Sequence, residues 1–112
     1  MSLPRDVQER MAAYPEFLRK VWRACASIPR GEVRSYGWIA RRIGRPSAAR
    51  AVGQALKRNP FSPVVPCHRV VPAGSLEGGR LRPGGPLGGY TAPGGVTIKA
   101  RLLRREGALK DA

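Results

Sequence analysis

Glycine and proline restrict where regular structure can form in this chain. The 112 residues include 14 glycines and 11 prolines, and both types are dense in "AGSLEGGRLRPGGPLGGYTAPGG", residues 73–95. These residue types favour turns, so the sequence predicts a long surface loop there, without regular structure. A chain of this length holds one compact core, and its helices must come from the segments on either side of the loop.

Apolar residues at helical spacing predict one helix before the loop and one after it. In "PEFLRKVWRACASIPRGEV" the inward positions before the stop at Pro29 and Gly31 are Phe17, Leu18, Val21, Trp22 and Cys25. In "VTIKARLLRREGAL" the inward positions before the stop at Gly107 are Ile98, Leu102 and Leu103. Cys25 is therefore expected to be a core thiol.

The segment "SYGWIARRIGRPSAARAVGQALKRNP" predicts two short helices joined by a turn at residues 44–46. Ser35 would cap the first helix, and Ser47 would cap the second. This is the pattern of a helix-turn-helix. The expected fold class is mainly α: a small winged helix-turn-helix-like domain, with a short strand and turn in "FSPVVPCHRVVP" and a long loop rich in glycine and proline.

The second of these two helices has an apolar side and a polar side. The apolar positions are Ala48, Ala49, Val52, Ala55 and Leu56. The positions available to a ligand are Arg50, Gln54, Lys57 and Arg58. Ala51 and Gly53 are small enough to let the helix approach a groove closely. The alternative is a basic helix face that meets only solvent.

Positive charge limits the class of partner. Lysine and arginine number 21 against 7 acidic residues, which gives a formal net charge of +14 and attracts phosphate. Nucleic acid is the first expected partner, and a membrane surface or a ribosomal or structural role are the alternatives. The sequence lacks both an apolar run long enough to span a bilayer and the apolar stretch of a signal peptide. We therefore expect an intracellular, cytoplasmic protein that associates with the nucleoid when bound to DNA.

Cys67 stands directly before His68, the only histidine, in "SPVVPCHRVV". Two cysteines and one histidine are too few for a four-ligand zinc site, so no metal or cofactor is expected, and a bridge between Cys25 and Cys67 remains an alternative. A thiol becomes a nucleophile when a base or cation stabilises its thiolate, and Glu106 is the acid best placed to orient His68. Neighbours on a strand point to opposite faces, so a turn or a water would have to join Cys67 to His68. The alternative for Cys67 is a small buried hydrophobe.

Several motifs in one order carry a resemblance to a known family. The stretch "SYGWIARRIGRPSAARAVGQALKRNPFSPVVPCHRVV", followed by "GGYT" and "IKARLLRREG", resembles the catalytic domain of the O6-alkylguanine-DNA alkyltransferases, also called methylated-DNA–protein-cysteine methyltransferases. The resemblance covers residues 15–107, and we expect a single alkyltransferase-type DNA-binding domain over residues 15–112 after an N-terminal extension of residues 1–14.

The resemblance implies a function and a partner. A monomer would bind double-stranded DNA in the minor groove and flip O6-alkylguanine into a pocket. Cys67 would then take the alkyl group irreversibly. By matching position, His68 would act through a water as the base for Cys67, Glu106 would hold the histidine, and Asn59 would brace the turn that carries the cysteine.

The resemblance also implies roles at the DNA. Arg50, in "ARAVG", would fill the hole left by the flipped base, and Tyr36, in "SYGWIA", would press on the adjacent phosphate. The other residues expected at the DNA are Ala51, Gly53, Gln54, Lys57, Arg58 and Arg69. The residues expected to line the alkylguanine pocket are Val65, Pro66, Tyr90 and Thr91.

The chain departs from the family pattern after the cysteine motif. The connection between "PCHRV" and "GGYT" is longer than usual, and Thr91 stands where a serine is common. These features resemble the alkyltransferase-like proteins, which bind alkylated guanine without repairing it, pass it to nucleotide excision repair, and typically lack the cysteine. Because Cys67 is present, transfer is the favoured function and lesion sensing the alternative. A third alternative is a transcription factor that reads major-groove base edges through Gln54 or Arg58.

Overall fold

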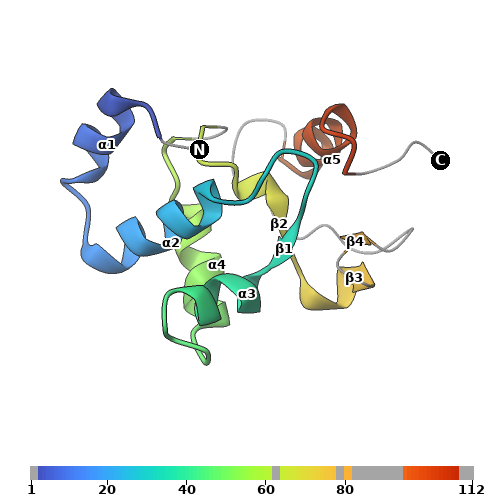
Figure 1. Ribbon diagram of the computed structural model, residues 1–112, viewed down its shortest axis with the longest axis horizontal. Helices are drawn as coiled ribbons and strands as arrows, with labels where there is room; N and C mark the ends of the chain where they lie inside the picture. Colours follow the sequence, from blue (N-terminus) through green and yellow to red (C-terminus); the bar gives the residue numbers. More distant parts are fainter. Residues whose placement is uncertain (1–2, 62–63, 78–79, 82–94, 109–112) are drawn as a thin grey trace.

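Helix α2, Glu16–Ala26, contributes five buried residues to the core, and the computed structural model in Figure 1 shows it in the left-hand half of the molecule. The structure describes residues 3–61, 64–77, 80–81 and 95–108. As predicted, α2 places an apolar side inward, and its buried residues are Leu18, Val21, Trp22, Ala24 and Cys25. Within the described ranges, no helix combines the length and the apolar character that crossing a membrane would require.

The predicted helix-turn-helix is present as α3, Tyr36–Arg42, and α4, Ala49–Lys57. Ser35 caps α3, because its hydroxyl oxygen accepts a hydrogen bond from the Trp38 amide at 3.0 Å. Gly44 ends α3 with a φ of +77°, a conformation that glycine adopts without steric cost. The prediction for Ser47 is wrong: the residue before α4 is Ala48, and no side chain caps this helix.

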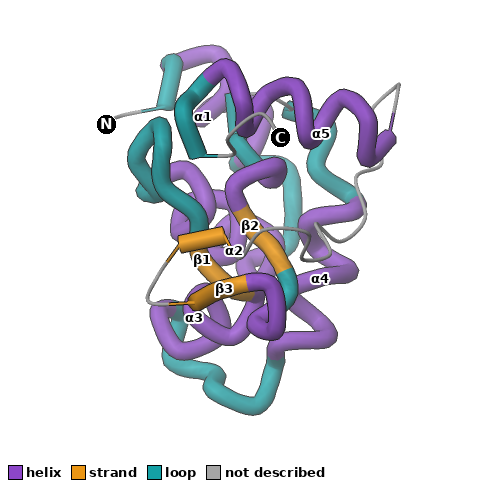
Figure 2. Tube along the Cα trace, turned by 90° about the vertical axis from the view of Figure 1, so that its right-hand side faces the viewer, coloured by secondary structure: helices purple, strands orange, loops and turns teal. Residues whose placement is uncertain are grey.

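Two short strands connect the helix-turn-helix to the cysteine motif (Figure 2). Strand β1, Arg34–Ser35, leads directly into α3 and pairs in parallel with β2, Val70–Val71. Immediately before β2, the chain forms a single 3₁₀ turn, η1, Cys67–Arg69. The strand and turn expected around the cysteine are therefore present, with the cysteine in the turn.

The segment after β2 differs in part from the predicted loop. A second 3₁₀ turn, η2, Ala73–Ser75, is followed by β3, Leu76–Glu77, which pairs antiparallel with β4, Arg80–Leu81. The two strands are separated in sequence by two glycines, a signal for a tight hairpin that the density of glycine and proline around it obscured. Residues 82–94 lie outside the described residues.

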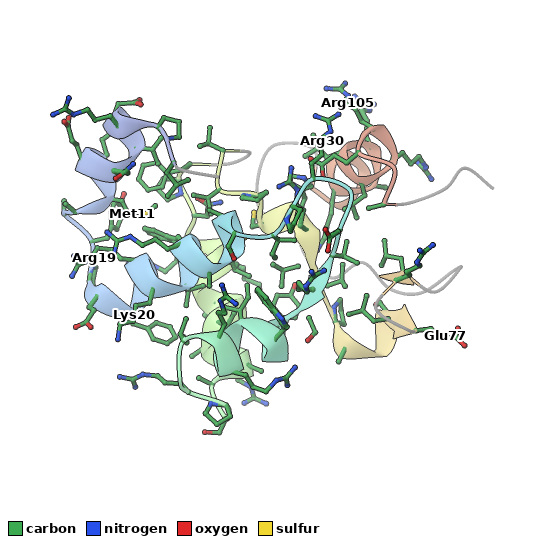
Figure 3. The ribbon with its side chains drawn as sticks, viewed as in Figure 1. Met11, Arg19, Lys20, Arg30, Glu77 and Arg105 are labelled. Carbon is green, nitrogen blue, oxygen red and sulfur yellow. The ribbon has the colours of Figure 1, made fainter. Side chains whose placement is uncertain are left out.

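Helix α5, Gly95–Arg105, closes the described chain. Leu103 is fully buried and Leu102 half-buried, as predicted, whereas the side chain of Ile98 lies outside the described residues. Gly107, with a φ of +81°, ends the helix, and the Ala108 amide donates to the Leu103 carbonyl at 2.9 Å. Near this end the Arg30 guanidinium donates to the Arg105 carbonyl at 3.4 Å (Figure 3).

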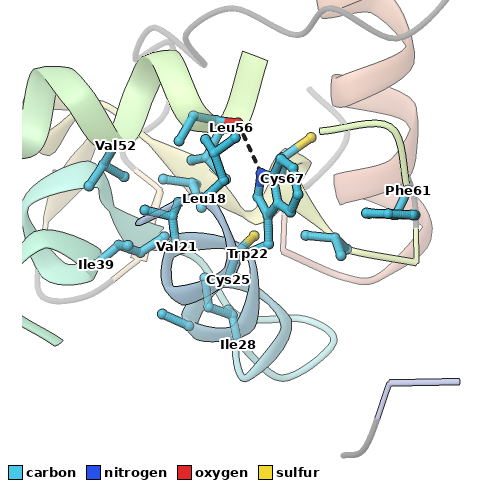
Figure 4. Packing of buried hydrophobic residues seen from close by; sticks show 14 of the residues in the cluster. Leu18, Val21, Trp22, Cys25, Ile28, Ile39, Val52, Leu56, Phe61 and Cys67 are labelled. Carbon is cyan, nitrogen blue, oxygen red and sulfur yellow. Dashed lines mark hydrogen bonds between the residues drawn. The ribbon is translucent and has the colours of Figure 1, made fainter. Parts of the chain in front are cut away.

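The main core cluster gathers buried residues from α1 to the start of β2, and Figure 4 shows part of it. The N-terminal segment belongs to it, because α1, Arg5–Met11, buries Val7 and Met11 against the other helices. Three aromatic rings, those of Tyr14, Trp22 and Phe61, meet edge to face with centroids 4.9–6.0 Å apart. The Trp22 indole also donates to the Ala55 carbonyl of α4 at 2.9 Å.

We predict that Trp22→Phe lowers the free energy of unfolding by about 1–3 kcal/mol, because it removes a buried hydrogen bond and part of a ring that fills the core. Chemical denaturation followed by circular dichroism would measure the change. Trp38→Phe is the matched control, since Trp38 is only half-buried, and its cost should stay below about 1 kcal/mol. Equal losses in the two variants would contradict the central role of Trp22.

Candidate functional site

Cys67 lies at the start of the turn η1, and the residues around it explain why. Pro66 has φ −83° and ψ 66°, and the Cys67 amide donates to the Val65 carbonyl at 2.9 Å. This geometry is that of an inverse γ-turn, which proline favours through its fixed φ. Because a 3₁₀ turn holds three residues, Cys67 and His68 do not point to opposite faces as they would on a strand. Cys67 is 9% exposed, and its thiol lies at the edge of the core.

Asn59 braces the chain that leads to the cysteine. Its amide nitrogen Nδ2 donates to the Val65 carbonyl at 2.9 Å, and its oxygen Oδ1 accepts from the Phe61 amide at 2.8 Å. One side chain therefore ties the end of α4 to the residues before Cys67. This is the arrangement that the sequence led us to expect of Asn59.

Glu106 joins the end of α5 to the turn η1. Its two carboxylate oxygens both lie 3.1 Å from Nε2 of His68. They also accept from Arg69, from Nε at 2.9 Å and from a terminal nitrogen at 2.7 Å. The paired geometry of Arg69 with a carboxylate is the strong, bidentate kind. The expected contact between Glu106 and His68 is thus present.

The environment of this pair sets the charge of His68. Burial lowers the pKa of His68 below its ordinary value, and the hydrogen bond and negative charge of Glu106 offset only part of that effect. Burial alone would raise the pKa of Glu106, but hydrogen bonds from Arg69 and His68 and their charges lower it. At neutral pH a neutral imidazole therefore donates through Nε2 to a carboxylate, and the lone pair of Nδ1 can accept a proton.

Lys99 is a site residue that the sequence interpretation missed. It is fully buried, and its ammonium donates to the Val70 carbonyl at 2.8 Å, three residues after Cys67. Burial lowers the pKa of Lys99 to about 8, while the two thiols, Cys67 and Cys25, act in the opposite direction. Lys99, Leu103 and Glu106 share one face of α5 by their spacing. The spacing of Lys99 and Glu106 from the apolar Leu103 was the sequence signal that could have identified Lys99 as an inward-facing residue.

Cys25 is the core thiol that the sequence predicted. It is fully buried, and burial, followed by the nearby Cys67, raises its pKa well above the ordinary value. No disulfide joins Cys25 to Cys67. Among the described residues, no three histidine, cysteine or acidic side chains are grouped so that they could hold a metal ion.

The residues expected at the DNA lie mostly on the outer side of α4. The exposed ones are Arg50, Ala51, Gln54, Lys57 and Arg58. Gly53 is half-buried, because the ring of Tyr36 lies over it: a Cβ at Gly53 would be 3.9 Å from Cδ1 of Tyr36. Burial, and then the two thiols, raise the pKa of Tyr36. Tyr36 thus joins the start of α3 to α4 at Gly53.

Three other expectations for the site have different outcomes. Arg69 was expected at the DNA, but its side chain is only 16% exposed and pairs with Glu106. Its guanidinium also donates to the Ile28 carbonyl at 2.8 Å. Val65 and Pro66, expected in the pocket, are buried beside Cys67. Tyr90 and Thr91 lie outside the described residues.

Sequence comparison relates the chain to curated proteins of one kind. The methylated-DNA–protein-cysteine methyltransferase of Methanosarcina acetivorans is 47% identical over 93 residues, which are 83% of this chain and 52% of that protein. The protein of the same name from Salmonella typhimurium is 48% identical over 104 residues, which are 93% of this chain and 54% of that protein. The chain thus spans about half the length of these curated relatives.

Structural comparison finds two kinds of neighbour. OGT of Mycobacterium tuberculosis, solved in complex with DNA, is 46% identical with a TM-score of 0.70, and the match covers 84% of this chain and 51% of that one. Atl1 of S. pombe, solved with damaged DNA that contains O6-carboxymethylguanine, is 36% identical with a TM-score of 0.63, and the match covers 82% of this chain and 76% of that one.

The family itself follows from the motifs, the site and a direct match. The model of the family described as "6-O-methylguanine DNA methyltransferase, DNA binding domain" matches residues 16–108, which are 93 of the 112 residues. That span contains the helix-turn-helix, the turn with Cys67 and His68, and Glu106 at the end of α5. The chain belongs to the 6-O-methylguanine DNA methyltransferase family and carries its DNA-binding domain.

Proposed function

We propose that this protein repairs DNA by transferring the alkyl group of O6-alkylguanine to the sulfur of Cys67. The observation that carries the proposal is the contact of Glu106 with Nε2 of His68, the residue next to Cys67. This contact fixes the tautomer of a neutral imidazole and leaves its other nitrogen able to take a proton. The names of the curated relatives, methylated-DNA–protein-cysteine methyltransferases, support the same reaction.

The transfer is a displacement at carbon. His68 takes the thiol proton of Cys67 through a water, and Glu106 stabilises the imidazolium that forms. The thiolate attacks the alkyl carbon, so an S–C bond forms while the bond from that carbon to O6 of guanine breaks. The proton returns to the released guanine by way of solvent. One thiol and one alkylguanine give one thioether and one guanine, and because a thioether is a poor leaving group each molecule reacts once.

The helix-turn-helix would present the base to the thiol. A guanine inside a duplex cannot expose its alkyl carbon, so the base must rotate out, at a cost of a few kcal/mol. Arg50, exposed at the start of α4, would fill the vacated place, and the small exposed residue Ala51 would let α4 enter the minor groove. Tyr36 would press on the adjacent phosphate. A net charge of +14 provides attraction to any sequence, which suits lesions that arise anywhere.

Lesion sensing is the second candidate function. It is favoured by the likeness to S. pombe Atl1, of whose chain the match covers 76%, against about half of the methyltransferases. In that case the protein would bind O6-alkylguanine without removing the alkyl group and pass it to nucleotide excision repair. The presence of Cys67 beside His68, with Glu106 in contact, supports transfer instead. In both cases we expect a monomer acting on intracellular DNA, without a cofactor.

We predict that Cys67→Ala abolishes loss of the methyl group from a duplex that contains O6-methylguanine, while its affinity for that duplex changes less than about threefold. The reason is that the nucleophile is removed and the DNA-binding side of α4 is untouched. Chromatography of the recovered DNA and a gel-shift titration would measure the two properties. Cys25→Ala is the control and should transfer normally, since its thiol is fully buried. Methyl loss that persists in Cys67→Ala would refute the proposed acceptor.

We predict that Glu106→Gln lowers the single-turnover rate of transfer by roughly 10- to 100-fold, because a charge-assisted hydrogen bond worth about 1.5–3 kcal/mol is lost. The pKa of His68 is already lowered by burial, so the wild-type rate should be level at neutral pH and fall only below about 6.5. Glu106 raises that pKa, so in the variant the fall should begin at a still lower pH. Rates measured from pH 5 to 8 at saturating DNA would test this.

An unchanged rate in Glu106→Gln, or a fall that begins at higher pH than in the wild type, would contradict the assignment of His68 as the base. Glu32→Gln is a suitable control variant. Glu32 is exposed and its carboxylate pairs with Arg34, not with His68, so its loss should leave the profile unchanged.

We predict that Arg50→Ala weakens binding to a lesion duplex about tenfold more than binding to an undamaged duplex, because only the lesion complex needs the flipped base replaced. Arg58→Ala is the matched control: Arg58 is exposed at the other end of α4, and as a phosphate contact it should weaken both complexes alike. Fluorescence anisotropy at fixed salt would give the affinities. Equal losses for the two duplexes in Arg50→Ala would remove Arg50 from this role.

A further inference from the structure

A basic groove lies between α2 and α3, apart from the outer side of α4. It has a volume of about 450 Å³ and is lined by Lys20, Arg23, Ala24, Ser27, Arg42 and Ile43. We refer to it as the α2–α3 groove. The four residues from α2 follow at three- and four-residue spacing and therefore share one face of that helix.

This groove faces away from the helix proposed to enter DNA. Trp22 marks the side of α2 that meets α4, through its hydrogen bond to the Ala55 carbonyl, and it is not part of the groove face. In Figure 1, α2 and α3 lie in front of α4, and the turned view of Figure 2 places α3 and α4 on opposite sides. A ligand in the groove and a duplex on α4 would therefore occupy different parts of the surface.

The groove carries positive charge that the acidic residues of the described ranges neutralise only in part. Lys20 pairs with Glu16 at 3.1 Å, and Figure 3 shows Lys20 at the outer side of α2. Within the part of the chain that the structure describes, neither Arg23 nor Arg42 has an acidic partner. Both side chains are exposed. Two arginines on one groove therefore remain available to carboxylates.

Apolar and aromatic surface accompanies these arginines. Ala24 is buried and Ile43 half-buried in the groove. Arg42 also lies over the ring of Trp38 at 5.5 Å, and Arg34 lies over the same ring at 5.5 Å. Tryptophan and arginine are the residues that most often dominate the binding energy of protein interfaces. A phosphate backbone would be met by polar and cationic groups and would make no use of the apolar residues.

We propose that the α2–α3 groove binds an acidic segment of a partner protein. Carboxylates of the segment pair with Arg23 and Arg42, and an apolar side chain of the segment packs on Ala24 and Ile43. The segment and DNA bind at the same time. This interaction does not depend on whether Cys67 accepts an alkyl group, so it can be tested independently of the proposed repair reaction.

The test uses the whole chain and a short fluorescein-labelled peptide of alternating glutamate and leucine at physiological salt. We expect binding by anisotropy, and changes in backbone NMR shifts confined to residues 20–27 and 38–43, with or without duplex present. Arg23→Gln with Arg42→Gln should weaken binding at least about tenfold. The matched control, Arg30→Gln with Arg101→Gln, removes the same charge from exposed positions outside the groove and should weaken it less than about threefold.

Three results would overturn the proposal. The first is absence of binding by the wild-type protein, or equal binding of a peptide with glutamine in place of glutamate. The second is equal weakening by both double variants, which would mean attraction to net charge alone. The third is that the Arg23 and Arg42 variant lowers affinity for undamaged duplex more than the control does and leaves peptide binding intact, which would make the groove a DNA surface. Circular dichroism would establish that all variants fold.

Discussion

The site depends on the contacts that the Glu106 carboxylate makes with His68 and Arg69. A negative charge at the end of a helix is disfavoured by the helix dipole, and Glu106 stands directly after α5. The bidentate pair with Arg69 and the contact with His68 offset that cost. Since His68 and Arg69 belong to the turn that starts at Cys67, this one carboxylate fixes the turn against the last helix. The end of α5 also lies close to the segment before β1, because a Cβ at Gly31 would be 3.0 Å from the Glu106 carbonyl oxygen.

Burying the charged groups around the turn costs free energy, and packing alone gives no reason for their presence. Replacing a buried ion pair by apolar residues is often neutral or stabilising, so such groups are weak evidence for a stabilising role. Here Glu106 is 7% exposed and Lys99 is fully buried, and both meet groups within three residues of Cys67. Strongly perturbed ionisable groups gather at functional sites more often than elsewhere. Their concentration at one turn of a small domain is consistent with chemistry at the cysteine.

The sequence predicted four of the five α-helices of the described residues and the site in part, whereas α1, in the expected N-terminal extension, was not predicted. Helical spacing identified α2 and the helix-turn-helix, because each buries one apolar side in a way that local pattern records. The contact between Glu106 and His68 was expected from the family resemblance, whereas the place of Arg69 was not, because its partner lies 37 residues away and spacing carries no information on such pairs. Lys99 was missed for a different reason: a lysine in a basic helix is expected at the surface, whereas the fold buries this one.

The hairpin of β3 and β4 shows another limit of composition. Glycine and proline predict turns, yet two strands of two residues each form here. Leu76 and Leu81 are paired across the hairpin and pack against the buried cluster of Val33, Val71 and Leu103. So short a pattern cannot be separated from a loop by periodicity.

We propose that the sulfur of Cys67 receives the alkyl group, and that Glu106 fixes the turn of Cys67 through His68 and Arg69. Peptide mass spectrometry of the wild-type protein, after incubation with a duplex containing O6-methylguanine, tests it most directly. We predict one added methyl group on the tryptic peptide of residues 59–69, in equal amount to the methyl lost from the DNA, and none on the peptide of residues 24–30 that contains Cys25. Tight binding to the lesion with no methyl on residues 59–69 would contradict the claim and leave lesion sensing as the function.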